Sequence, residues 1–262
     1  MTPTTARFPN APQPPLTCSR WRTLVCSICL LAFSALPGRT NTPGEVHYPD
    51  LVTLPPSEVR LQNSAGRRYL RFSNVIANLG RGRLEVFAEH NAATGMTDAF
   101  QQLYTHDSSG NWIPTATRHV GTFEFHSTHD HWHLEGFARY ELRDVAPDGS
   151  IGGTILSLSA KVSFCLLDSV AANLNLEHAE PRTFTQCGVD IPQGISVGWA
   201  DVYRWNLPGQ SLDITGLSNG TYWLVSTADP FDLLAEGGGA AEINNTGAVK
   251  INIKGGKARI VE

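Results

Sequence analysis

Histidines concentrate in one short part of this chain. Four of the nine fall within the eight residues from His126 to His133. Because His129, His131 and His133 alternate, all three side chains point to one face of an extended strand. Three neutral imidazoles with an open coordination position suit Cu(II) or Zn(II), and the affinity order among divalent ions favours copper. His126 falls outside this alternation and is expected to be a substitute ligand or a neighbour of the ligands. The alternatives to metal binding are a solvated histidine-rich strand and an acid-sensing cluster.

Two other side chains offer reactive groups. Lys161 has apolar residues on both sides, between Leu158 and Cys165, and these would favour its neutral, nucleophilic amine. A strand lysine whose amine reaches water is the ordinary alternative. Taken by itself, Tyr203 has the pattern of an ordinary core aromatic residue with its hydroxyl near solvent.

The composition predicts a globular protein with many turns. Of 262 residues, 41% are hydrophobic and 17% charged, with 24 glycines and 16 prolines. These values exclude collagen, a coiled coil, a disordered chain and a multi-span membrane protein. The first 40 residues contain four arginines and no acid, so residues 41–262 carry 24 acidic and 16 basic side chains, a formal charge of −8. This charge argues against a nucleic-acid partner and favours cationic substrates.

Residues 1–40 are predicted to be an export signal or an N-terminal anchor. Arg20 and Arg22 precede an apolar run, Leu24 to Leu36, whose 13 residues are fewer than the about 20 of an ordinary membrane span. Residues 41–262 are therefore expected to be exported, either secreted or periplasmic, with no stable membrane partner beyond such an anchor. Cys165 and Cys187 form an even pair for an oxidising compartment, so a disulfide is expected; two metal-binding thiolates are the alternative.

From Pro43 onward the pattern predicts an all-β fold, a single antiparallel β-sandwich with long functional loops. Short apolar or alternating runs are separated by turn residues, and long amphipathic helices are scarce. Residues Asn78 to Gly82 are expected to form a hairpin connection, and Asp168 to Trp199 a long loop. The expected strands are Tyr69–Val75, Arg83–Glu89, Phe123–Phe125, Phe137–Leu142, Ile155–Leu167, Thr221–Thr227 and Ala248–Ile253.

Three stretches, in order along the chain, resemble segments of the lysyl oxidases. The stretch Phe123–His133, followed by Phe137–Leu142, resembles the family's copper-binding segment. The stretch Lys161–Leu166 resembles the segment around its cofactor-forming lysine, and Gly194–Tyr203 the one around its cofactor-forming tyrosine. The resemblance runs from about Tyr48 to Ile253, so residues 41–262 are expected to form a lysyl-oxidase-like catalytic domain.

The resemblance implies an enzyme, a copper-dependent quinone amine oxidase of lysyl oxidase type. Primary amines, either peptidyl lysine or small amines, would be oxidatively deaminated to aldehydes with O₂, and ammonia and hydrogen peroxide would be released. The implied cofactors are copper(II), bound by His129, His131 and His133, and a lysyl tyrosylquinone made from Lys161 and Tyr203. Such a group supplies an electron sink that no ordinary side chain provides.

Asp201 is a candidate for the base that removes the substrate's α-proton. It lies two residues before Tyr203 and so on the same face of a strand. A solvated loop carboxylate is the equal alternative. Arg139 stands where the animal enzymes have a histidine, so a role of that histidine does not carry over.

The ends of the domain carry a smaller match, to a structural calcium site of the family. Asp50 and Leu51 near the start, and Asn244 and Asn245 near the end, resemble positions whose oxygen atoms suit a hard cation. Turn formation explains the same residues equally well.

Two other functions remain open. A non-enzymatic exported copper-binding module would keep the histidines but never form the quinone, and it has no need for Lys161 and Tyr203 in register. A zinc hydrolase would use the histidines and an acid such as Glu135 to activate water, although the chain has no HExxH spacing.

Overall fold

The computed structural model describes residues 44–127, 131–160, 163–188, 190–238 and 240–261. The predicted signal or anchor over residues 1–40, His129 and Lys161 lie outside these ranges. The regular secondary structure of the described residues is almost entirely β-strand, with one short helix, α1 (Ala240–Ile243). None of its helices has the length and hydrophobicity needed to cross a bilayer.

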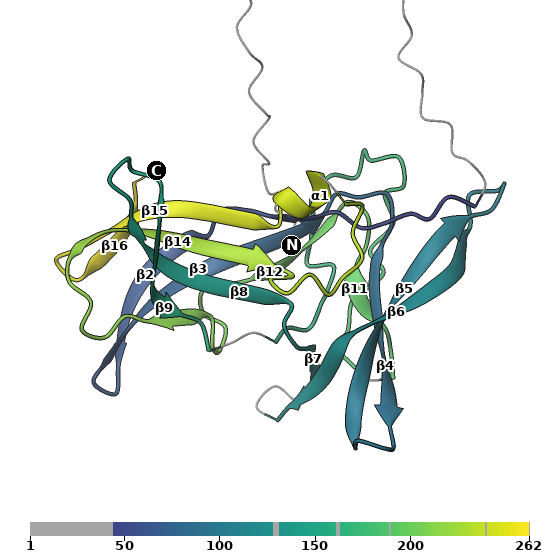
Figure 1. Cartoon of the computed structure of the whole chain (residues 1–262), viewed down its shortest axis with the longest axis horizontal. Helices are drawn as coiled ribbons and strands as arrows, with labels where there is room; N and C mark the ends of the chain where they lie inside the picture. Colours follow the sequence, from purple (N-terminus) through teal and green to yellow (C-terminus); the bar gives the residue numbers. More distant parts are fainter. Residues whose placement is uncertain (1–43, 128–130, 161–162, 189, 239, 262) are drawn as a thin grey trace, which may run out of the picture.

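Three antiparallel sheets make up the fold (Figure 1). The first has the order β1 (Leu51–Thr53), β3 (Arg67–Asn78), β12 (Trp199–Tyr203) and β10 (Val170–Ala171), with β2 (Ser57–Ser64) and β13 (Ser211–Asp213) also paired to β3. The second has the order β11 (Gln193–Ile195), β4 (Leu84–Asn91), β5 (Met96–His106), β6 (Trp112–His126) and β7 (His131–Leu134). The third has the order β16 (Lys257–Ile260), β15 (Thr246–Lys254), β14 (Gly220–Ala228), β8 (Ala138–Val145) and β9 (Ile151–Leu158).

The hydrophobic core takes side chains from all three sheets. Phe72 of β3 and Tyr140 of β8 are both fully buried, and their rings meet edge to face with centroids 5.0 Å apart. Burial of each such aromatic side chain stabilises the fold by roughly 1.5–3 kcal/mol. The prediction of an antiparallel all-β fold is confirmed, and the second sheet adds a third layer that stands at the end of the other two in Figure 1.

The expected hairpin connection over residues 78–82 is wrong. Strand β3 belongs to the first sheet and β4 to the second, so this turn carries the chain between sheets. The side-chain amide of Asn78 fixes the crossing, because its Nδ2 donates to the carbonyl oxygens of Gly82 and Ile195, both at 2.9 Å. A β-carbon on Gly80 would collide with the backbone of residues 48–50, so only glycine fits there.

The expected strand Ile155–Leu167 is also wrong in its second half. Strand β9 pairs with β8 in the third sheet and ends at Leu158. Phe164 instead pairs with Leu134 of β7, in the second sheet, through backbone hydrogen bonds of 2.7 and 3.0 Å. The chain after Leu158 therefore leaves one sheet and reaches another.

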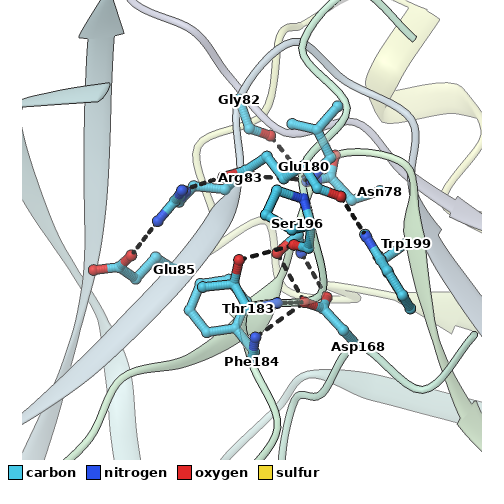
Figure 2. A network of polar contacts seen from close by, with 12 residues as sticks. Asn78, Gly82, Arg83, Glu85, Asp168, Glu180, Thr183, Phe184, Ser196 and Trp199 are labelled. Carbon is cyan, nitrogen blue, oxygen red and sulfur yellow. Dashed lines mark hydrogen bonds and ion pairs between the residues drawn. The ribbon is translucent and has the colours of Figure 1, made fainter. Parts of the chain in front are cut away.

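A disulfide and one carboxylate fasten the long loop between β10 and β11. Cys165 and Cys187 form the expected disulfide, with Cα atoms 5.8 Å apart. The carboxylate of Asp168, fully buried, accepts hydrogen bonds from the backbone N–H groups of Thr183, Phe184 and Ser196, at 2.8–3.0 Å, and from the Ser196 hydroxyl (Figure 2). Since four donors converge on one side chain, the middle of the loop and the residue after β11 are both tied to Asp168, which lies two residues before β10 of the sheet that carries Tyr203.

Candidate functional site

The histidine-rich segment forms an antiparallel hairpin of β6 and β7. His126 lies opposite His131 in the ladder, and Glu124 lies opposite His133. The ring of His133 is 4.8 Å, centroid to centroid, from the rings of both His126 and His131. Three of the four clustered histidines thus gather at one end of the second sheet, and the fourth, His129, is outside the described residues.

The segment after Lys161 connects this hairpin to Tyr203. The Ser163 hydroxyl lies 3.3 Å from Nδ1 of His133, and both side chains are buried. The next residue, Phe164, packs its ring edge to face against Tyr203, with centroids 4.6 Å apart. One short segment therefore contacts a histidine of the metal candidate on one side and the candidate tyrosine on the other.

Tyr203 itself is nearly fully buried, and both of its hydroxyl contacts are defined. The hydroxyl donates to the carbonyl oxygen of Cys165, 2.9 Å away, and to the carboxylate of Asp201. Burial raises the pKa of Tyr203 well above its usual value, and the Asp201 carboxylate raises it further. The phenol is thus neutral, with its proton directed at a carboxylate.

Asp201 is not the solvated carboxylate of the alternative reading. It is 3% exposed, and it accepts hydrogen bonds from the Ser169 hydroxyl at 2.7 Å and from the Leu167 N–H at 3.2 Å, as well as from Tyr203. Burial raises its pKa to about 6, although these hydrogen bonds act in the opposite direction. The expectation that Asp201 and Tyr203 share one strand face agrees with this contact.

A pair of glutamates, Glu124 and Glu135, lies beside the histidines. Burial is the main cause that raises the pKa of Glu135 to about 7, and the neighbouring carboxyl of Glu124 is the second cause. The Ser163 hydroxyl acts in the opposite direction and lowers this pKa. Ser163 therefore adjoins both Glu135 and His133. A carboxyl group that titrates near neutral pH is suited to proton transfer.

The residues predicted to hold calcium also lie together, at the junction of β1 and the α1–β15 segment. Asn244 Nδ2 donates to Asp50 Oδ1 at 2.8 Å, and the Thr53 N–H donates to the Asn244 carbonyl at 3.2 Å. Glu236 joins this group, because its carboxylate accepts from the Leu51 N–H at 2.6 Å and from Asn245 Nδ2 at 2.7 Å. Burial raises the pKa of Glu236 to about 7.

The comparison with protein families bears on the same part of the chain. The family model for lysyl oxidase matches residues 99–261, more than half of the sequence. The chain belongs to the lysyl oxidase family. The matched range contains all three motif stretches, together with Asn244 and Asn245, and Asp50 precedes it.

Several lysyl oxidase family members resemble the chain at low identity. Human lysyl oxidase homolog 1 is 31% identical over 138 residues, which cover 52% of this chain and 22% of that protein. Human lysyl oxidase homolog 3 is 29% identical over 189 residues, 72% of this chain and 19% of that protein. Protein-lysine 6-oxidase of Sus scrofa is 28% identical over 138 residues, 52% of this chain and 50% of that protein. The matched part thus spans between about a fifth and a half of these relatives.

Reasoning from the sequence missed two polar residues of these sites. Ser163 lies in the motif after Lys161 but has no chemistry that a pattern would single out. Glu236 lies eight residues before Asn244 in an apolar and glycine-rich stretch. An acidic residue in an apolar stretch of sequence indicates a buried carboxylate, which needs polar partners or a cation.

Proposed function

We propose that this lysyl oxidase family member is an exported amine oxidase that uses copper(II) and a lysyl tyrosylquinone derived from Lys161 and Tyr203. One observation carries the proposal. Ser163 and Phe164, two and three residues after Lys161 in the chain, contact His133 and Tyr203 respectively. The three motifs therefore adjoin one another in space, as a cofactor made from two of them beside the third requires.

The donor chemistry around His133 suits copper. His126, His131 and His133 offer imidazole ligands from one hairpin, and His129 lies between them in the sequence. The Ser163 hydroxyl near Nδ1 of His133 can orient the ring and leave Nε2 for a metal, as partners of metal-bound imidazoles do. Bound copper with O₂ supplies the oxidation that makes the quinone, and the quinone supplies the electron sink for amine oxidation.

Two carboxylates divide the proton chemistry in this proposal. Asp201 Oδ2 accepts a hydrogen bond from the Tyr203 hydroxyl, so Asp201 fixes the direction of the phenol and offers an acceptor for its proton when the ring is oxidised. Glu135, half-buried beside His133, is the better candidate for the base that removes the α-proton, since its pKa is about 7. Asp201 has its carboxylate already occupied by four donors.

The proposed substrates are primary amines, peptidyl lysine or small amines, with O₂ as the second substrate. One relative is named protein-lysine 6-oxidase, which is a precedent for lysine side chains in proteins. A formal charge of −8 over residues 41–262 attracts a protonated amine to the surface. An exported location, secreted or periplasmic, fits the Cys165–Cys187 disulfide.

We include a structural calcium ion held by Asp50, Leu51, Asn244, Asn245 and Glu236. The side-chain oxygens of Asn244 and Asn245 are buried without a hydrogen-bond partner among the described residues. Carboxylate and amide oxygens are the ligands that Ca²⁺ prefers. Such an ion would tie β1 to the segment before β15.

The test loads the purified protein with copper in air and then adds a primary amine. Peroxide release and a coloured phenylhydrazine adduct are both expected for the wild type, and neither is expected for Lys161→Ala or Tyr203→Phe. The matched controls are Lys254→Ala, an exposed lysine, and Tyr222→Phe, whose hydroxyl donates only to the Ser218 carbonyl at 2.9 Å; both should react as the wild type does.

The same experiment separates the other two functions. A copper-binding module would take up copper but give no adduct and no peroxide. A zinc hydrolase would release no peroxide, and its activity would depend on zinc and on Glu135. Either outcome in a correctly folded, copper-loaded wild type would reject the amine oxidase.

A further inference from the structure

A second group of three histidines lies away from the β6–β7 hairpin. His47 precedes β1, His106 ends β5, and His178 lies in the long loop before β11. The ring centroids are 4.5 Å apart for His47–His106, 4.9 Å for His47–His178 and 4.5 Å for His106–His178. One ring nitrogen of each residue lies within 4.8 Å of the other two.

This group is distant from the proposed copper residues. His106 pairs with Trp112, the first residue of β6, and His126 is the last residue of the same strand. A strand of this length separates its ends by on the order of 45 Å. The two groups are therefore independent.

We propose that His47, His106 and His178 form a second metal site, for a divalent first-row transition ion such as Zn(II). The ion would be held by three imidazoles from three segments that are far apart in the sequence. This site is additional to the proposed amine oxidase chemistry and does not depend on it.

Two of the ring nitrogens are buried without a hydrogen-bond partner among the described residues. His47 is 4% exposed, and its Nδ1 is buried with no hydrogen bond from the rest of the described chain. The same holds for Nε2 of His178. A buried polar atom left without a partner costs about 1–3 kcal/mol, and a metal ion is a partner for an imidazole lone pair.

The three rings are in the form that binds metal. Burial lowers the pKa of His47 and of His178, and it lowers the pKa of His106 to about 4, with repulsion from the neighbouring histidines as a further cause for His106. Neutral imidazole is the species that coordinates zinc or copper.

The charges around the group are compatible with a bound cation. The guanidinium of Arg81 lies nearby, but it is flanked by the carboxylates of Glu45, 3.7 Å away, and Glu177, 3.6 Å away. Glu177 also approaches His178 Nε2 to 4.0 Å. The formal charge of two carboxylates exceeds that of one guanidinium, and Glu177 is close enough to serve as a fourth ligand.

The polar network of Figure 2 holds His178 near the sheet. Glu180, two residues later, forms an ion pair with Arg83, and its backbone carbonyl accepts a hydrogen bond from Trp199 Nε1 at 2.8 Å. The Arg83 guanidinium lies over the ring of Trp112, 5.3 Å from its centroid, and the rings of Trp112 and His106 contact each other in a tilted arrangement with centroids 3.9 Å apart. The loop histidine and the strand histidine are thus fixed by the same side chains.

The spacing needs only a small closure. Tetrahedral zinc with Zn–N bonds of 2.0–2.1 Å separates its nitrogen ligands by about 3.3 Å, so the rings must approach by at most roughly 1.5 Å, which rotation of the side chains provides. His106 and His178 also line a cavity of about 460 Å³, and its volume leaves room for a water molecule on the ion.

Zinc content after equilibrium dialysis against buffered ZnCl₂ tests the site. We expect about two zinc ions per wild-type chain, one in the proposed copper site and one here. The variant His106→Gln/His178→Gln should lose one ion, and His131→Ala/His133→Ala should lose the other. The matched control His90→Gln/His119→Gln, which changes two exposed histidines, should keep both.

The zinc content of the two double variants distinguishes the second metal site from the proposed copper site. If the hairpin binds no zinc, the wild type will hold one ion that only the His106→Gln/His178→Gln change removes. Equal zinc content in that variant and the wild type would overturn the second site.

A measurement on the unmodified protein covers the case in which that variant does not fold. Zinc should protect His106 and His178 from diethyl pyrocarbonate at least about 5-fold, as read by peptide mass spectrometry, and leave His90 unprotected. Unchanged labelling of both residues with zinc present would contradict the site.

Discussion

The hydroxyl of Tyr203 has the contacts that a precursor of an oxidised cofactor would need. It is shielded from bulk water, its proton is directed at Asp201, and a backbone carbonyl also accepts from it. The Tyr203–Asp201 contact follows from residue spacing alone, because side chains at i and i+2 of β12 share a face. The approach of Ser163 to His133 joins residues 30 positions apart and has no local signal.

Replacement of Asp201 by Asn should slow quinone formation. An amide cannot receive the phenol's proton, so we expect the phenylhydrazine-reactive chromophore to appear at least about 10-fold more slowly after copper is added in air, an effect typical of a lost proton acceptor. The control is Asp213→Asn, a partly exposed carboxylate on β13 that pairs with Arg67, and it should leave the rate unchanged. Equal rates for Asp201→Asn and the wild type would show that Asp201 does not act on Tyr203.

The same variant should change how stability depends on pH. The Asp201 carboxyl has a pKa of about 6 in the folded protein against 3.8 for an ordinary aspartate, so between these values the folded state binds more protons than the unfolded state. This group therefore stabilises the fold most at low pH, and its contribution falls as pH rises from about 4 to 6. Urea denaturation from pH 4 to 7.5 should show the wild type losing stability relative to Asp201→Asn over that range; a constant difference would contradict it.

At the scale of elements, the long loop depends on a few anchors between segments that are distant in sequence. The cysteine pair and the loop itself were predictable, since residues 41–262 contain two cysteines and each can pair with the other. The role of Asp168 was not, because its donors lie 15–28 residues ahead. For a similar reason the crossing at Asn78–Gly82 was mistaken for a hairpin, since turn residues do not reveal which sheet the next strand joins.

Removal of the Asp168 carboxylate should destabilise the protein strongly. Asp168→Ala leaves the buried N–H groups of Phe184 and Ser196, and the partly buried N–H of Thr183, without this acceptor. Each buried group costs about 1–3 kcal/mol, so we expect a loss of roughly 2–6 kcal/mol in the free energy of unfolding. Urea denaturation of the oxidised protein measures it. Asp190→Ala, an exposed aspartate of the same loop, is the matched control and should change the value by less than about 0.5 kcal/mol.

For the whole molecule, three clusters of polar side chains join segments that are remote in the sequence. The proposed copper site and the second histidine group occupy the two ends of β6, and the proposed calcium residues join β1 to the start of β15. Family resemblance predicted the first and third of these. Nothing in the sequence near His47, His106 or His178 predicted the second, because its members meet only through the fold.

Calcium should stabilise the fold by holding β1 to the segment before β15. At a concentration 100 times its dissociation constant, a ligand adds about 2.7 kcal/mol, which for a domain of this size raises Tm by roughly 5–10 °C. Differential scanning calorimetry with calcium and with EGTA measures the shift, and Glu236→Gln/Asn245→Ala should abolish it. A shift that persists in this variant would place the ion elsewhere.

The central proposal is that Lys161 and Tyr203 become one cofactor. Its most direct test is tryptic peptide mapping by mass spectrometry after copper loading in air and then reduction and alkylation of the Cys165–Cys187 disulfide, which would otherwise join the peptides. We expect a single joined peptide that contains both residues, uncleaved after Lys161, and absent from Tyr203→Phe and from protein kept free of copper. Recovery of the two peptides separate and unmodified from fully copper-loaded wild type would contradict the proposal.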